Sequence, residues 1–275
     1  MKKLAASVGI TAMVLATTAS AWAHDGEGNH ISFGDNKQCD VALNYDVAVE
    51  PKKLTVSDGG KEVYRVEFGK LFVEGKEIAL NSSQQALVND YSEQVSKQVP
   101  EVIELVNDAV EIATSAVSMA LTPLLGDASG AKIDTMMDGL SERIESVAYQ
   151  NGDKFYIGAT ESSLEQTFGE DFEKELDQLV QSSIGSMMMT LGSEMMAGDG
   201  DTFEEKMNSF GQRMERMGQD IEREMEQQAQ DLEVRAERVC DNFEQLLVTE
   251  NKLRAQVPSL KNYALIDTSN QPLRE

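Results

Sequence analysis

The chain has 275 residues and carries 24 Lys and Arg against 48 Asp and Glu, which gives a formal net charge of −24. Its hydrophobic fraction of 41% is too high for a disordered acidic tail, and it is sufficient for one substantial core or two small ones. The acidic balance argues against partners such as nucleic acids and anionic membrane surfaces, because both attract clustered Lys and Arg.

Residues 1–23 have the organisation of a secretory signal peptide. The positive start MKK precedes an apolar run over residues 4–20, and Ala21-Trp22-Ala23 provides a small-x-small cleavage site. The apolar run is at the short end of a membrane span and is rich in Ala and Thr, so removal is favoured over retention as an anchor. We therefore expect export to the periplasm of a Gram-negative cell, cleavage after Ala23, and no stable membrane span in the mature chain.

Residues 24–38 are polar and Gly-rich, which predicts a flexible N-terminal arm. Cleavage would leave His24 with a free α-amine beside its imidazole, a chelating pair that copper favours, and His30 could add a third nitrogen. An arm in which these histidines bind nothing is the simpler interpretation, because no rigid second shell accompanies them. We predict no metal site and no cofactor, with His24 and His30 as the candidates if copper binds.

Residues 39–158 are expected to form an antiparallel sheet with buried helices. Apolar residues alternate with polar or small ones over residues 41–49, and the DGG sequence at 58–60 is typical of a hairpin turn. With the short hairpin pattern that follows, residues 39–80 indicate a meander of four or five antiparallel strands.

The hydrophobic period becomes helical after residue 81. Ser82 and Gln85 are spaced as a capping box at the start of a helix that Pro100 would kink or break. Residues 101–125 are apolar on most sides, but their uncharged stretch is too short to span a membrane, which favours a central buried helix. Another helix is expected to start over 129–140.

Residues 143–158 fit two interpretations. Their apolar spacing suits either a hairpin with a tight Asn151-Gly152 turn or the end of a helix followed by a strand. In both cases we expect the strand from Lys154 to Gly158 to join the N-terminal sheet.

Residues 159–257 predict a long, acidic, Met-rich helical hairpin, followed by a C-terminal tail over 258–275. Ser163 is placed to open the first helix, which would run to about Ala197, and Thr202 is placed to cap the second. Apolar residues then follow a heptad stripe with a stutter, as in coiled coils, at Phe203, Met207, Phe210, Met214, Met217, Ile221, Leu232, Ala236, Val239, Phe243 and Leu246. The predicted fold class is α+β: a small antiparallel β-meander packed on a buried helix, with a long coiled-coil-like C-terminal helical hairpin.

The common enzymatic motifs are missing from the sequence. No Gly-x-Ser-x-Gly sequence occurs, and no histidine follows His30 to serve a nucleophile. The segment 129–132 matches Ser-x-x-Lys, but it lacks the partner motifs of penicillin-recognising enzymes. Acidic residues are so numerous that neighbouring carboxylates are unavoidable, which keeps an enzyme with an unrecognised carboxylate site as an alternative. We predict no catalytic residues and no enzyme activity.

Methionine is the most unusual feature of the composition, because nine of the 14 methionines fall between Met187 and Met225. Three consecutive ones cannot share one face of a helix, so some thioethers should be exposed or covered by a partner. Flexible Met surfaces suit apolar partners, soft thioethers could also bind Cu(I), and core or oligomer packing is the simplest alternative. The candidate partner-binding residues are Met187, Met188, Met189, Met195 and Met196.

Cys39 and Cys240 are the only cysteines in the chain. In an oxidising periplasm such an even pair is more often a structural disulfide than two free thiols. A metal site would need more ligands nearby, and no Cys-x-x-Cys motif is present. We therefore predict a Cys39–Cys240 disulfide that ties the first strand to the last helix.

The layout of the chain resembles the YggN-like family of periplasmic proteins, which carry a domain of unknown function. The resemblance rests on the signal peptide, on Cys39 before the strand VALNYDV, on the turn and strand GKEIAL that begin at Gly75, and on the late Cys240. It covers the whole mature chain, and it implies a periplasmic location and no established activity.

The Met-rich acidic hairpin favours a non-enzymatic binding, chaperone-like or scaffold role in the cell envelope. The expected partners are envelope proteins or apolar polypeptide segments, and oligomer formation stays open. The alternatives are a periplasmic copper binder that uses the Met-rich helix or the N-terminal histidines, and the carboxylate enzyme described above.

Overall fold

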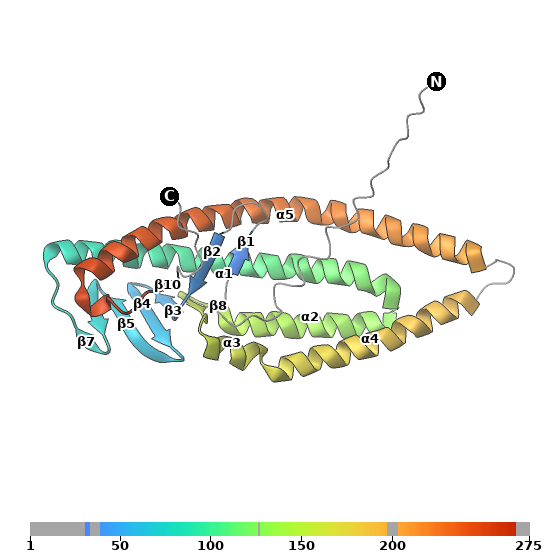
Figure 1. Ribbon diagram of the computed structural model, residues 1–275, viewed down its shortest axis with the longest axis horizontal. Coiled ribbons are helices and arrows are strands. Elements are labelled where there is room, and N and C mark those ends of the chain that lie inside the picture. Colours follow the sequence, from blue (N-terminus) through green and yellow to red (C-terminus); the bar gives the residue numbers. More distant parts are fainter. Residues whose placement is uncertain (1–30, 34–38, 126, 197–202, 268–275) are drawn as a thin grey trace, which may run out of the picture.

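The computed structural model describes residues 31–33, 39–125, 127–196 and 203–267. An antiparallel sheet occupies one end of the elongated molecule, and long helices extend from it to the other end (Figure 1). The α+β class and the long C-terminal helix that the sequence predicts are confirmed. Within the described ranges, none of the helices has both the length and the apolar character needed to cross a membrane.

The main sheet has seven antiparallel strands in the order β7-β6-β5-β4-β3-β9-β8. Its first five strands are a meander in which alternate residues such as Val47, Leu54, Val56 and Val66 are buried on one face. Gly59 supports a tight turn by adopting a positive φ of 52°. The strands are β3 (Asp46–Glu50), β4 (Lys53–Asp58), β5 (Lys61–Glu67), β6 (Lys70–Val73), β7 (Lys76–Glu77), β8 (Ala148–Asn151) and β9 (Lys154–Ile157).

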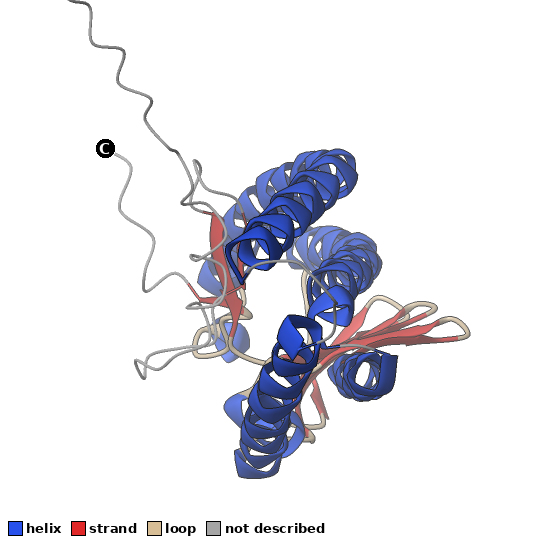
Figure 2. Cartoon of the chain, turned by 90° about the vertical axis from the view of Figure 1, so that its right-hand side faces the viewer, coloured by secondary structure: helices blue, strands red, loops and turns tan. Residues whose placement is uncertain are grey.

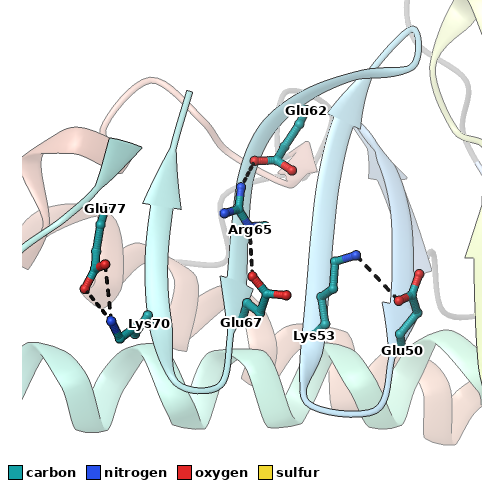
Figure 3. A network of polar contacts seen from close by, with 7 residues as sticks. All are labelled: Glu50, Lys53, Glu62, Arg65, Glu67, Lys70 and Glu77. Atoms are coloured by element: carbon teal, nitrogen blue, oxygen red, sulfur yellow. Dashed lines mark hydrogen bonds and ion pairs between the residues drawn. The ribbon is translucent and has the colours of Figure 1, made fainter. Parts of the chain in front are cut away.

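Ion pairs between oppositely charged side chains line the meander, as Figure 3 shows. The N–O distances are 3.5 Å for Lys53–Glu50, 2.6 Å for Arg65–Glu62, 3.3 Å for Arg65–Glu67 and 3.0 Å for Lys70–Glu77. The Arg65 guanidinium also lies 3.9 Å from the centre of the Phe72 ring. Such solvent-facing pairs contribute about 0–1 kcal/mol each, so the buried face of the sheet dominates its stability.

The single strand that we expected over residues 41–49 is two strands in different sheets. The chain bends at Asn44 and Tyr45, so β2 (Cys39–Leu43) leaves the meander and pairs with β1 (Ile31–Phe33) and β10 (Ile266–Asp267). At the bend, the backbone N–H of Asn44 donates to the Leu265 carbonyl at 2.9 Å. Period-two alternation continues across the bend and therefore hides it. Residues 31–33 of the predicted flexible arm are also a strand.

Residues 143–158 combine both interpretations that the sequence left open. Helix α2 (Asp127–Val147) ends directly before the β8–β9 hairpin, so the apolar spacing serves first a helix and then a strand. Strand β9 pairs with β3, which confirms that the strand at Lys154 joins the N-terminal sheet.

Helix α1 (Ser82–Leu125) corrects two expectations. Of the kink or break expected at Pro100, the break does not occur: the helix continues through the proline, and Val99, Val102 and Ile103 around it are all buried in the core. Its capping box lies one residue earlier than predicted: the Gln84 N–H donates to Asn81 Oδ1 at 2.9 Å, and the Asn81 N–H donates to Gln84 Oε1 at 3.0 Å.

The helix predicted from Ser163 to about Ala197 is two helices, α3 (Glu161–Phe168) and α4 (Glu170–Met196), with Gly169 between them. Thr160 caps α3, since its hydroxyl oxygen accepts the Ser163 N–H at 3.3 Å. The cap therefore lies three residues before the Ser163 that the pattern favoured.

The core lies between the sheet, α1 and α5 (Phe203–Gln256), and the 3₁₀ turn η1 (Pro258–Leu260) closes its end. Helix α1 contributes buried residues toward both neighbours, among them Val88, Tyr91, Val95, Val99 and Leu105. Helix α5 contributes the second half of its heptad stripe, from Ala236 to Leu246, and then Leu253, and the buried Val257 follows directly after the helix. A second, smaller cluster around Ile133 and Met137 joins α2 to the far part of α1.

The predicted hairpin partners do not pack against each other as a coiled coil along their described lengths. Helix α5 packs along α1, whereas α4 packs against α1 and α3 on another side of the bundle. The two helices diverge from the end at which they are joined (Figures 1 and 2). A heptad stripe fixes which face of α5 is apolar, but it does not specify the partner, and here α1 takes that place.

Candidate functional site

The outward face of α4 carries a row of exposed apolar side chains. Val180, Ile184 and Met188 are spaced four residues apart, so they lie on one face, and 55%, 52% and 71% of their surfaces are exposed. Met189, the next residue, is 76% exposed and lies beside this row, about 100° further around the helix. We call Val180, Ile184, Met188 and Met189 the α4 face. Side chains of this type are normally buried in a core or covered by a partner.

The same side of α4 is acidic toward the start of the helix. Glu173 and Asp177 precede Val180 by seven and three residues, which places them in line with the apolar row. Both carboxylates belong to exposed residues. One side of the helix therefore reads as an acidic half followed by an apolar half.

The opposite side of α4 is held by α2 and α3. Arg143 of α2 pairs with Glu175 at 2.7 Å, and its guanidinium lies 5.2 Å from the centre of the Phe172 ring. Arg143 also donates to the Thr167 carbonyl at 3.0 Å. Phe172 meets Phe168 edge to face with ring centres 5.6 Å apart. These contacts fix the first turns of α4 and orient its acidic and apolar side away from the rest of the fold.

A polar cleft of about 650 Å³ lies beside these anchoring contacts, between α2, α3, α4 and β9. Hydroxyl, amide and charged groups surround it, and among the described residues that line it Arg143 is the one cation. The lining residues are Gly139, Glu142, Arg143, Ser146, Val147, Tyr156, Ser163, Gln166, Thr167 and Glu175. Arg143 is already bound to Glu175 and to the Thr167 carbonyl, so its main role at the wall of the cleft is to hold α4 in place. We call this region the joint.

Asp46 is a buried carboxylate behind this joint. Oδ1 accepts hydrogen bonds from the backbone N–H groups of Ala159 and Thr160 and from the Thr160 hydroxyl, each at 2.9 Å. Oδ2 accepts the Ser163 hydroxyl, also at 2.9 Å. These four hydrogen bonds explain how a carboxylate tolerates burial at 1% exposure, and they tie the start of α3 to β3.

Glu250 of α5 is a second buried carboxylate. It accepts the backbone N–H groups of Leu265 and Ile266, the latter at 3.2 Å, and so holds the C-terminal strand segment. Burial raises the pKa of Glu250, an effect that the two N–H donors and the Arg254 charge oppose. Nearby, the Tyr64 and Tyr91 hydroxyls lie 2.7 Å apart, and burial raises the pKa of both phenols.

The two buried carboxylates do not form a paired acid–base site, because each is bound to a different part of the chain. Asp46 organises the β3–α3 joint, whereas Glu250 organises the junction of α5 with the C-terminal strand. The residues that the structure describes contain no cluster of three or more metal-ligating side chains. A paired-carboxylate mechanism therefore finds no support in these two groups.

The structure places part of the predicted binding set on the α4 face. Exposure of Met188 and Met189 confirms that the methionine triplet does not share one buried side. The side chains of Met187, Met195 and Met196 lie outside the described residues, as do His24, His30 and the predicted cleavage site. The sequence analysis missed Val180 and Ile184. Their positions, eight and four residues before Met188, place all three on one face of a helix and could have indicated them.

Of the two cysteines in the predicted disulfide, the structure describes the side chain of Cys240 alone. Cys240 is disulfide-bonded, and no cysteine in the described part of the chain is a free thiol. Strand β2, which begins at Cys39, packs against α5, which carries Cys240. Since the side chain of Cys39 lies outside the described residues, the Cys39–Cys240 pairing stays a prediction.

The fold and the α4 face define an α+β protein with a candidate interaction surface on a long helical extension. The chain belongs to a family described as protein of unknown function (DUF2884), whose model matches residues 39–266. This match covers the seven-stranded sheet and the five α-helices of the described residues, and it begins after β1. Comparison with curated proteins gives no match, and comparison with solved structures gives none.

Proposed function

We propose that this family member is an exported periplasmic protein, without enzyme activity, that binds apolar polypeptide segments through the α4 face. The observation that carries the proposal is the exposure of Val180, Ile184 and Met188 in one row. Solvation of such a row is unfavourable, and a partner that covers it gains the free energy of apolar burial. The role is that of a binding or chaperone-like component of the cell envelope.

The composition of the face suits adaptable binding. Methionine side chains are flexible and polarizable, so Met188 and Met189 can adjust to apolar partners of different shape. The spacing from Val180 to Met188 is the spacing with which helices present anchors to an apolar surface. Because Arg143 and Phe172 fix the base of α4, the row is displayed on an already ordered helix.

Export is supported by three features of the chain. The first 23 residues have the signal-peptide pattern, and the layout resembles the periplasmic YggN-like family. The disulfide at Cys240 is typical of proteins that fold in an oxidising compartment. A Cys39–Cys240 bond would tie β2 to α5 and would suit that location.

Site-specific crosslinking tests the binding role. A photo-crosslinking amino acid is placed at Ile184 and, as a matched control, at Val248 of α5, which is equally exposed at 52%. We expect crosslinks to other polypeptides from position 184 in the periplasm and few from position 248. The replacement of Val180 and Met188 by Gln should remove the crosslinks from position 184.

Two outcomes would contradict the proposal. Equal crosslinking from positions 184 and 248 would show that capture depends on general exposure and not on the α4 face. Absence of crosslinks at both positions, in protein that is folded by circular dichroism, would show that the face is unoccupied in the periplasm.

A further inference from the structure

We infer that the partner of the α4 face is a basic amphipathic segment, with its apolar side on Val180, Ile184 and Met188 and its Lys or Arg side chains over Glu173 and Asp177. This inference rests on the proposed function and names the chemistry of the partner. It follows from the continuity of the acidic and apolar halves along one side of α4.

The length of the surface fits a short polypeptide segment. From Glu173 to Met188 the helix rises roughly 22 Å at about 1.5 Å per residue. A partner helix of about four turns, or an extended segment of about seven residues, spans that distance. Both can present apolar groups along one part and cations along the other. The charge pattern of α4 therefore specifies the direction in which the partner segment runs, and it is compatible with a helical or an extended partner.

Stabilisation of the helix itself explains only part of the acidic half. Acidic residues in a first turn interact favourably with the helix dipole, and α4 has Glu170, Asp171 and Glu173 there. Lys174 pairs with Glu170 at 3.3 Å and with Asp171 at 3.6 Å. Asp177 lies beyond that turn.

Glu173 and Asp177 form a like-charge pair four residues apart, an arrangement that is unfavourable in an isolated helix. A cation that lies between the two carboxylates removes this repulsion. The free protein therefore has two repelling carboxylates next to an exposed apolar row. A basic amphipathic partner would reduce the repulsion and also cover the apolar side chains.

The charge of the whole chain points to the same partner. A net charge of −24 repels a second copy of the chain and an anionic lipid surface, but it attracts a cationic segment over long range. The contact should therefore weaken as salt screens the charges. A salt-independent apolar contact is the expected signature of a partner without this basic character.

Three peptides of identical apolar pattern provide the test. One is an amphipathic Leu/Lys peptide, the second has Gln in place of every Lys, and the third has Glu in those positions. Binding to the purified full chain is measured by fluorescence anisotropy at low and high salt. We expect the order Lys, Gln, Glu from tightest to weakest, with a salt effect that is largest for the Lys peptide.

Matched variants locate the effect on the protein. Glu173→Gln with Asp177→Asn should weaken the Lys peptide by roughly threefold to tenfold and leave the Gln peptide unchanged. The control is Glu222→Gln with Glu226→Gln, which removes an exposed acidic pair of the same spacing from α5. That control should change the affinity of the Lys peptide much less.

The outcomes separate this inference from the proposed function. If the three peptides bind equally but binding is lost in Val180→Gln with Ile184→Gln, the face binds apolar segments and the basic partner is wrong. If none binds, both proposals fail. Binding of anionic vesicles, or a dimer that the Val180 and Ile184 substitutions dissociate, would replace the basic segment by a membrane or a second copy and overturn the inference.

Discussion

The two ends of the molecule treat the same kind of apolar stripe differently. At the sheet end, α5 residues such as Phe243, Leu246 and Leu253 are at most 8% exposed. At the far end of the same helix Met207 is 42% exposed, and Ile221 is only partly buried. Helix α1 shows the same trend, because Leu105 is buried whereas Ile112, seven residues later on the same face, is only partly buried.

The difference arises from the number of layers that cover each helix. At the sheet end, α1 lies between a β-sheet and α5, so apolar side chains are covered on two sides. Toward the far end the sheet is absent, so helices alone cover one another. An apolar stripe therefore predicts which side of a helix is apolar. The layers that pack against that side determine how far its side chains are buried.

The largest expected effect concerns the link between α5 and the small sheet at the covered end. Closing a loop of about 200 residues with a Cys39–Cys240 disulfide stabilises the fold by up to roughly 5 kcal/mol in the chain-entropy estimate. Reduction should therefore lower the melting temperature markedly, and Cys39→Ser should melt like the reduced protein. Thermal denaturation with and without reductant measures both effects.

Intact-mass analysis after alkylation without reductant is the control for that pairing. One species with no alkylated thiol is expected for the oxidised chain. Two alkylated thiols on freshly isolated folded protein would show that the bond is absent. In that case non-covalent packing alone would stabilise the sheet end.

Truncation of one apolar residue at each end tests the comparison directly. Leu253→Ala removes a side chain that is 1% exposed and should cost about 2–5 kcal/mol. Ile221→Ala acts on a partly buried position of the same helix and should cost about 1 kcal/mol or less, because less apolar area returns to water and Ala favours the helix. Chemical denaturation of both variants gives the two values, and equal losses would mean that the far end is covered as completely as the sheet end.

Glu250 makes the covered end sensitive to pH. Burial raises the pKa of this carboxyl above that in the unfolded chain, so the folded state binds the proton more tightly between the two values. The stability contributed by this protonation is full below the unfolded pKa and is lost as pH rises through the folded pKa. We expect a negative slope of stability against pH in that window, and Glu250→Gln should flatten it. A steeper slope in the variant would contradict this account.

Local patterns predicted most of the elements, and non-local contacts account for the errors. The bend at Asn44 depends on a hydrogen bond to Leu265, more than two hundred residues away, which no local pattern contains. The cap at Asn81 was missed because the next residue, Ser82, is also a good cap. The α4 face was found only at its methionines, since Val180 alone is an ordinary helix residue and its exposure depends on where α5 packs.

The smallest expected effect on stability is that of a substitution on the α4 face. It contrasts most clearly with the same substitution in the core. Ile184→Gln replaces a side chain that is 52% exposed, so the free energy of unfolding should change by no more than about 0.5 kcal/mol. Leu246→Gln, at 1% exposure on α5, places an amide in the core and should destabilise the fold strongly. Thermal melts of the two variants, at several protein concentrations, provide the measurement. A large, concentration-dependent loss in Ile184→Gln would mean that a second copy covers this row in the free protein, because only an interface couples stability to concentration.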